Sequence, residues 1–222
     1  VAQKERRERA VLVGVERPGL PWPLESSLAE LERLADTAGA DVVATTTQRL
    51  DAPNPRTFVG TGKADEIAEL ARSREADLVI FDDELTPSQQ ANLEKVMDKS
   101  VKVIDRTALI LDIFALHATS KEGRLQVRLA QNQYLYPRLR GMWAHLASNR
   151  MGGGVGSRFG EGESQLEVDR RMVRKRITSI RRELERLSDR VKETINLSIL
   201  VDNEIFYLDK VETQRSITCS TR

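Results

Sequence analysis

The 222-residue chain is long enough for one large domain, or for a small domain with an appendage. A single cysteine, Cys219, excludes an internal disulfide, and with only two histidines there is no Cys/His ligand set for zinc, so a reducing cytosol is indicated. No apolar run approaches about 18 residues and the N-terminus lacks a hydrophobic region, so we expect a cytoplasmic protein with no membrane span and no export signal.

The formal net charge of +1 conceals an uneven distribution along the chain. Residues 1–120 carry 15 Lys and Arg against 21 Asp and Glu, whereas residues 121–190 carry 16 against 8. A basic element attached to an acidic body indicates a polyanionic partner such as a nucleic acid. The alternative is that the arginines only keep surface helices soluble.

Strands and helices alternate through the first half of the chain. Ser26 and Ser27 are suited to cap the first helix, and Thr86 with Pro87 to begin the third. The alternation predicts an α/β domain over residues 1–118, built on a small parallel sheet with covered faces. The expected strands are residues 10–15, 42–46, 78–81 and 101–104, with a short β-like stretch at 57–59, and the expected helices are residues 28–39, 63–74, 87–97 and 107–117.

Residues 123–147 and 164–191 each repeat apolar side chains at alternating steps of four and three, which is typical of a coiled-coil seam. A short link between two such segments favours antiparallel pairing, so residues 119–191 are predicted to form a long α-helical hairpin. Residues 192–222 are left as a tail without assigned structure, although two apolar β-like runs flank Asp202 and Asn203. The seam positions are Leu125, Leu129, Asn132, Tyr136, Leu139, Trp143 and Leu146, then Leu166, Arg170, Val173, Ile177, Ile180, Leu184, Leu187 and Val191.

Six glycines lie within residues 152–163, between the two helical segments. Each glycine costs roughly 1 kcal/mol in a helix relative to alanine, so residues 148–163 are predicted to be a loop at the tip of the hairpin. Glycine lets backbone approach a crowded surface and arginine matches phosphate, so we expect RNA binding there; the alternative is a plain linker. The candidate RNA-binding residues are Arg138, Arg140, Arg150, Gly152, Gly153, Gly154, Gly156, Arg158, Gly160, Gly162, Arg170, Arg171, Arg174 and Lys175.

Gly60, Gly62 and Lys63 are weak candidates for binding a phosphate. Thr57 stands where a Walker A loop needs its first glycine, and Ala64 stands where it needs Ser or Thr. A turn between a strand and a helix is therefore favoured over a nucleotide site. The acidic run at residues 82–84 is interpreted as a solvated strand end, and we assign no catalytic or metal-binding residues.

Five stretches together resemble the N-terminal region of the HflX family of ribosome-associated GTPases. The resemblance implies a small α/β domain, followed by a hairpin whose loop reaches the peptidyl transferase centre of the large ribosomal subunit, in contact with 23S-type ribosomal RNA. It also implies a link to ribosome splitting or rescue and to stress. The stretches are NPRTFVGTGKADEI, LTPSQQANLE, VIDRTALILDIFALHA, LQVRLAQNQYLYPRL and GGGVGSRFGEGESQLEVDRR.

Two departures from the family pattern are visible. The family's loop usually reads RGPGE, whereas residues 158–163 read RFGEGE. Residues 191–222 contain no GxxxxGK[ST], DxxG or NKxD motif, so GTP and Mg²⁺ are implied only for full-length relatives and we expect no GTP hydrolysis from this polypeptide. Two alternatives to an RNA-binding module stay open: a nucleotide hydrolase, acting through a catalytic domain outside the chain or through Lys63, and a coiled-coil assembly protein.

Overall fold

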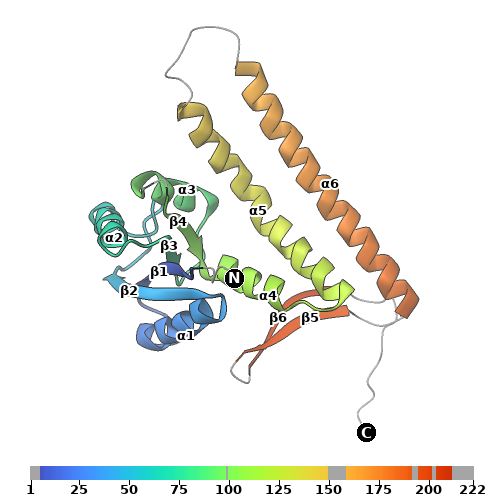
Figure 1. The fold of residues 1–222 in the computed structure, drawn as a ribbon, viewed down its shortest axis with the longest axis horizontal. Helices are drawn as coiled ribbons and strands as arrows, with labels where there is room; N and C mark the ends of the chain where they lie inside the picture. The colour runs from blue at the N-terminus through green and yellow to red at the C-terminus, as the bar shows by residue number, and fades with distance from the viewer. Residues whose placement is uncertain (1–5, 99, 150–158, 192–194, 202–203, 212–222) are drawn as a thin grey trace, which may run out of the picture. The chain divides into compact units, whose positions relative to one another are not determined.

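Figure 1 shows the fold of the computed structural model, which describes residues 6–98, 100–149, 159–191, 195–201 and 204–211. The chain divides into two compact units. The first contains the chain up to Leu116 together with helix residues from Pro137 onward, and the second contains His117–Tyr136 together with the later helix and strands. These units divide the chain differently from the predicted domains 1–118 and 119–191, because one long helix contributes to both.

A parallel four-stranded sheet organises the first unit, which confirms the predicted α/β class. The strand order is β2-β1-β3-β4. All six residues from Ala10 to Val15 of β1 are buried, as expected for a parallel sheet covered on both faces. The strands are β1 (Glu8–Glu16), β2 (Ala40–Arg49), β3 (Leu78–Phe81) and β4 (Lys102–Asp105).

Helices cover the two faces of this sheet. On one face, Val13 of β1 lies in a core cluster with Ile67 and Leu93. On the other face, a Cβ atom added to Gly14 would lie 2.9 Å from the side chain of Leu24 and 3.1 Å from that of Leu28, so glycine permits a close approach of helix to strand. The helices are α1 (Leu24–Thr37), α2 (Thr61–Ser73), α3 (Pro87–Val96) and α4 (Arg106–His117).

The predicted start of the third helix is confirmed and that of the first is wrong. The Thr86 hydroxyl accepts from the Gln89 amide and the Gln89 side chain accepts from the Thr86 amide, which forms a capping box before Pro87. α1 begins at Leu24 instead, with Pro23 at its N-cap and no side-chain cap. The Ser27 hydroxyl lies inside the helix and donates to Asp82 Oδ2 at 2.6 Å.

The β-like stretch predicted at residues 57–59 is not a strand. Asn54 and Phe58 exchange two backbone hydrogen bonds of 2.8 and 2.9 Å, which make one isolated antiparallel bridge. Phe58 has a φ of +65°, a left-handed conformation that ends the extended segment. The stretch is therefore a tight turn that leads from β2 toward α2.

The second unit contains the N-terminal part of α5 (Lys121–Asn149) and the whole of α6 (Phe159–Val191). The two helices run antiparallel here, since contacts move backward along α6 as they move forward along α5. Burial of the predicted seam residues Leu129 (2 % exposed) and Leu184 (1 % exposed) stabilises the pair. From the start of α5 the contacts are Lys121 with Glu183, Leu125 and Leu129 with Ile180 and Leu184, and Tyr136 with Arg174.

Two glycines assigned to the loop lie in a helix. α6 begins at Phe159, so Gly160 and Gly162 belong to its first turn. α6 has 33 residues, and extending a helix that has already formed is easier than starting one. This extension offsets the unfavourable helix propensity of two glycines at its end. At its other end the predicted loop is also too long, because Ser148 and Asn149 are the last residues of α5. Residues 150–158 of the predicted tip lie outside the described residues.

Two antiparallel strands follow α6, where the sequence indicates β-like runs. β5 (Ile195–Val201) pairs with β6 (Glu204–Val211) in a two-stranded sheet. Separately, no helix within the described residues has the length and apolar character that crossing a membrane requires.

Candidate nucleic-acid interface

Basic side chains are dense on α6 between residues 170 and 187, where eight Lys and Arg stand against two Glu. Val173, Ile180 and Leu184 of this segment are buried, at 7, 7 and 1 % exposure. Lys175 and Arg182 are exposed. Helical periodicity therefore separates an apolar face from a cationic face that is open to solvent.

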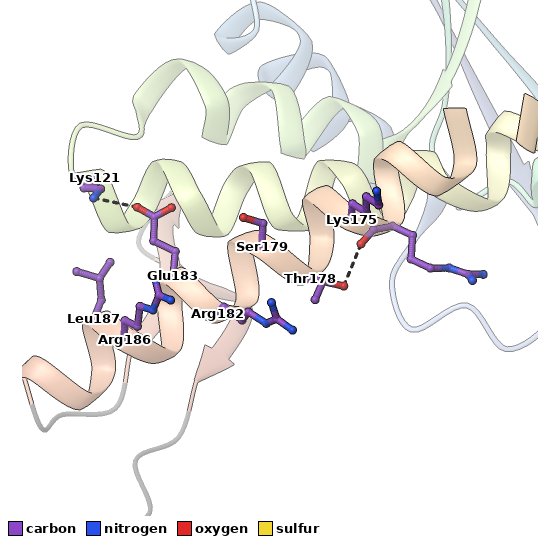
Figure 2. Close-up of a pocket in the computed structure, with 9 residues that line it drawn as sticks. Lys121, Lys175, Thr178, Ser179, Arg182, Glu183, Arg186 and Leu187 are labelled. Carbon is purple, nitrogen blue, oxygen red and sulfur yellow. Dashed lines mark hydrogen bonds and ion pairs between the residues drawn. The ribbon is translucent and has the colours of Figure 1, made fainter. Parts of the chain in front are cut away.

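A groove runs along the cationic face, and we call it the α6 groove (Figure 2). Its lining forms two neighbouring ridges of residues spaced four apart, which is the ordinary ridge geometry of a helix. Glu183 is the one acidic residue of the lining, and its Oε1 atom lies 2.9 Å from Lys121 Nζ of α5. The lining residues are Lys121, Arg174, Lys175, Thr178, Ser179, Arg182, Glu183, Arg186 and Leu187.

Tyr136 of α5 contacts two arginines of α6 at one end of this face. Arg174 donates a hydrogen bond of 2.7 Å to the phenol oxygen, and Arg170 donates one of 3.4 Å. Both guanidinium groups also lie against the ring, that of Arg170 at 5.4 Å and that of Arg174 at 5.7 Å from its centroid. The hydrogen bond from Arg174, with that from Arg170, holds the pKa of Tyr136 below the ordinary tyrosine value.

Arg138, predicted to bind RNA, is instead placed in the interior of the first unit. Its side chain is 8 % exposed, and its Nη2 atom donates to the Leu85 carbonyl at 2.7 Å and to the fully buried Asp105 carboxylate at 3.1 Å. Its Nε atom donates to Gln90 at 2.9 Å. A guanidinium held in this way cannot reach a phosphate on the surface, so Arg138 is a structural residue.

The other predicted RNA-binding residues separate into two groups. The structure exposes Arg171, Arg174 and Lys175 on α6, and it places the half-buried Arg170 against Tyr136 of α5. The sequence reasoning missed the remaining groove residues, although Arg174, Thr178, Arg182 and Arg186 follow one another at a spacing of four. The side chains of Arg140, Arg150 and Arg158 and glycines 152, 153, 154 and 156 lie outside the described residues.

The chain matches two family models, described as GTP-binding GTPase N-terminal over residues 25–115 and GTP-binding GTPase Middle Region over residues 117–196. It is 51 % identical to GTPase HflX of Alkalihalophilus pseudofirmus over 178 residues, which are 80 % of this chain and 41 % of that protein. It is 49 % identical to GTPase HflX of Escherichia coli over 160 residues, which are 72 % of this chain and 36 % of that protein. The chain belongs to the HflX family.

Two solved structures have a similar fold. The crystal structure of SsGBP with GDP has a TM-score of 0.58 and 22 % identity, and covers 83 % of this chain and 45 % of that chain. A GTP-binding protein of Sulfolobus solfataricus in complex with GDP has a TM-score of 0.55 and 19 % identity, and covers 90 % of this chain and 59 % of that chain. Compared with its curated HflX relatives, the present chain spans about two fifths of their length.

The weak phosphate-site candidates form a strand-to-helix turn in this HflX chain. The Gly60 amide donates to the Gln48 side chain at 2.9 Å, and Gly60 is the N-cap of α2. Lys63 Nζ lies 2.6 Å from Glu66 Oε1, and this hydrogen bond holds the pKa of Glu66 below its usual value. An amide and a cation that a phosphate would need are therefore already engaged within the protein.

The prediction that the acidic run at residues 82–84 is a solvated strand end is wrong for its first two residues. Asp82 is 9 % exposed in its side chain and lies 2.8 Å from Arg106. Asp83 is 18 % exposed and lies 2.5 Å from Arg17. These pairs link the residues that directly follow β1, β3 and β4 in this chain. Among the described residues, no group of three or more His, Cys, Asp or Glu is arranged to hold a metal ion.

Proposed function

We propose that this chain is the ribosome-binding region of a cytoplasmic HflX-type protein, which contacts 23S-type ribosomal RNA of the large subunit near the peptidyl transferase centre. The cationic face of α6 is the observation that carries this proposal. Its Lys and Arg side chains lie open to solvent, and guanidinium and ammonium groups are suited to RNA phosphates. Membership of the HflX family supports the choice of the ribosome among polyanionic partners.

In this proposal α5 and α6 act as an antiparallel coiled-coil hairpin that carries the glycine-rich segment between them, residues 150–158, into the large subunit. Buried contacts such as Leu129 and Ile180 keep the arms together, so that the tip is presented on a stiff support. Binding at this place would link the protein to the splitting or rescue of ribosomes under stress.

GTP and Mg²⁺ belong, in this proposal, to the part of full-length relatives that this chain does not span. The chain covers 41 % of the Alkalihalophilus relative. Within the printed sequence, the Lys63 turn lacks the Walker A residues and its amide and ammonium groups are engaged. Nucleotide turnover through the α/β unit is therefore the weaker candidate function.

Salt dependence tests the proposal directly. If six phosphates are neutralised on binding, affinity for purified large subunits should fall by roughly 10³-fold between 50 and 200 mM salt. Co-sedimentation of the chain with large subunits at the two concentrations measures this fall, and sedimentation of the chain alone provides the control. Binding that does not change with salt would contradict an electrostatic interface.

A second expected result concerns the tip. Replacing Gly152, Gly153 and Gly154 by valine should weaken co-sedimentation with large subunits, because side chains there obstruct a close approach of the backbone to RNA. Denaturant unfolding of the α/β unit should be unchanged, since its core lies in other residues. If the triple variant binds as the parent does, the segment is a connection only.

A further inference from the structure

We propose that the α6 groove is a binding site for the sugar-phosphate backbone of double-stranded RNA, separate from the glycine-rich tip. The proposal rests on the function proposed above and specifies the form of RNA that this face binds. It uses only residues of the second unit, from the start of α5 and from α6.

Charge is the first argument. The carboxylate of Glu183 is matched by Lys121, so the acid in the lining does not offset the other cations. Among the described residues, no carboxylate lies within ion-pair distance of Lys175, Arg182 or Arg186. Within the part of the chain that the structure describes, the groove therefore presents cations without a carboxylate partner, and a phosphate can take that place.

Length is the second argument. Arg174, Thr178, Arg182 and Arg186 form one ridge, and twelve residues of helix rise about 18 Å. B-DNA carries one phosphate per strand about every 3.4 Å of its axis, so a ridge of this length matches roughly five phosphates of such a duplex, and a duplex in general offers several phosphates over this distance. A straight helix with regularly repeated cations fits a backbone that is itself regular and stiff.

The absence of a stacking platform is the third argument. Proteins that bind single strands stack bases on aromatic side chains, and no aromatic residue is among those that line the groove. Tyr136 contacts Arg174, which lines the groove, but the ring of Tyr136 already has two guanidinium groups against it. The surface is therefore suited to a backbone and not to unstacked bases.

Hydroxyl groups favour RNA over DNA. Thr178 and Ser179 lie side by side in the sequence and both line the groove (Figure 2). The Thr178 hydroxyl donates to the Arg174 carbonyl at 3.1 Å, which leaves its oxygen as an acceptor. Hydroxyls between cations can contact the 2′-hydroxyls that distinguish an A-form RNA duplex from DNA.

Two double variants of α6 test this site with the same loss of charge. Lys175→Gln/Arg182→Gln removes two cations from the groove, and Arg176→Gln/Arg181→Gln removes two exposed cations of the same helix that do not line it. The probe is an RNA hairpin with a stem of about 16 base pairs, compared with a single strand of one arm and with the DNA duplex of that sequence. Fluorescence anisotropy at several salt concentrations gives the affinities.

We expect the parent chain to bind the RNA duplex more tightly than the single strand or the DNA duplex. The groove variant should lose about tenfold or more in affinity and about two units of salt slope, and the matched variant should lose less than about threefold. An equal loss in both variants, or equal or tighter binding of the single strand, would overturn the proposal. The function proposed above has its own readout, because a parent chain that binds the duplex but does not pellet with large subunits refutes that function alone.

Discussion

Replacing Arg138 by alanine is expected to destabilise the α/β unit by about 3 to 5 kcal/mol, a large fraction of the stability of a domain. The reason is the buried carboxylate of Asp105, which is fully inaccessible and lies 3.1 Å from the guanidinium. Without Arg138, Asp105 keeps its bonds from the Leu85 and Ala108 amides but loses that counter-charge. Denaturant unfolding followed by circular dichroism measures the loss.

A second substitution distinguishes this charge effect from lost packing. Adding Asp105→Asn to Arg138→Met should restore part of the stability that Arg138→Met removes, because the double variant buries no isolated charge. Arg128→Ala, at an exposed site earlier in α5, should change the free energy of unfolding by less than about 0.5 kcal/mol. Arg138 would be a surface residue, and our assignment wrong, if the two alanine variants were equally stable.

The second large effect is expected at the packing of α5 against α6. Ile180 is 7 % exposed and lies in a cluster with Leu125, Leu129 and Leu184. Ile180→Asp places an unpaired charge there, and the cost should be several kcal/mol, enough to separate the helices. Thermal unfolding and helicity by circular dichroism measure the effect.

Met172→Asp is the matched control for this experiment. Met172 lies on the same helix and is 45 % exposed, so a carboxylate there stays hydrated. The free energy of unfolding of the Met172→Asp variant should remain close to that of the parent chain. Equal stability of the Ile180→Asp variant would show that the two helices do not depend on this cluster.

Local signals in the sequence predict most helices and strands of the α/β unit. The apolar run of β3 is bounded at Leu78 and Phe81 as predicted, and the Thr86, Pro87 and Gln89 combination fixes the start of α3. Such features depend on neighbours a few residues away. The start of α1 is predicted wrongly because Ser26 and Ser27 are typical N-cap residues, whereas the N-cap is Pro23, which has no side-chain cap.

Contacts between residues far apart in the sequence determine the surroundings of several side chains, and local patterns cannot predict these surroundings. Arg138 looked like one more basic residue of a helix, but its partners lie 33 and 53 positions earlier in the chain. Asp82 looked solvated because acidic runs usually are, whereas Arg106 and Ser27 approach it from two other elements. The α6 groove also needed the fold, since Lys121 neutralises Glu183 across 62 residues of sequence.

Because Arg138 lies on α5 while its partners lie beside the sheet, the α/β unit is not a contiguous block of sequence. A fragment that ended at residue 118 would contain every strand of the parallel sheet, yet it would leave Asp105 without its guanidinium. Recombination or gene fusion at that point would therefore separate two halves of one ion pair. The unit can be exchanged between proteins as an independent module only together with α5, because the residues of this helix from Pro137 onward belong to the unit.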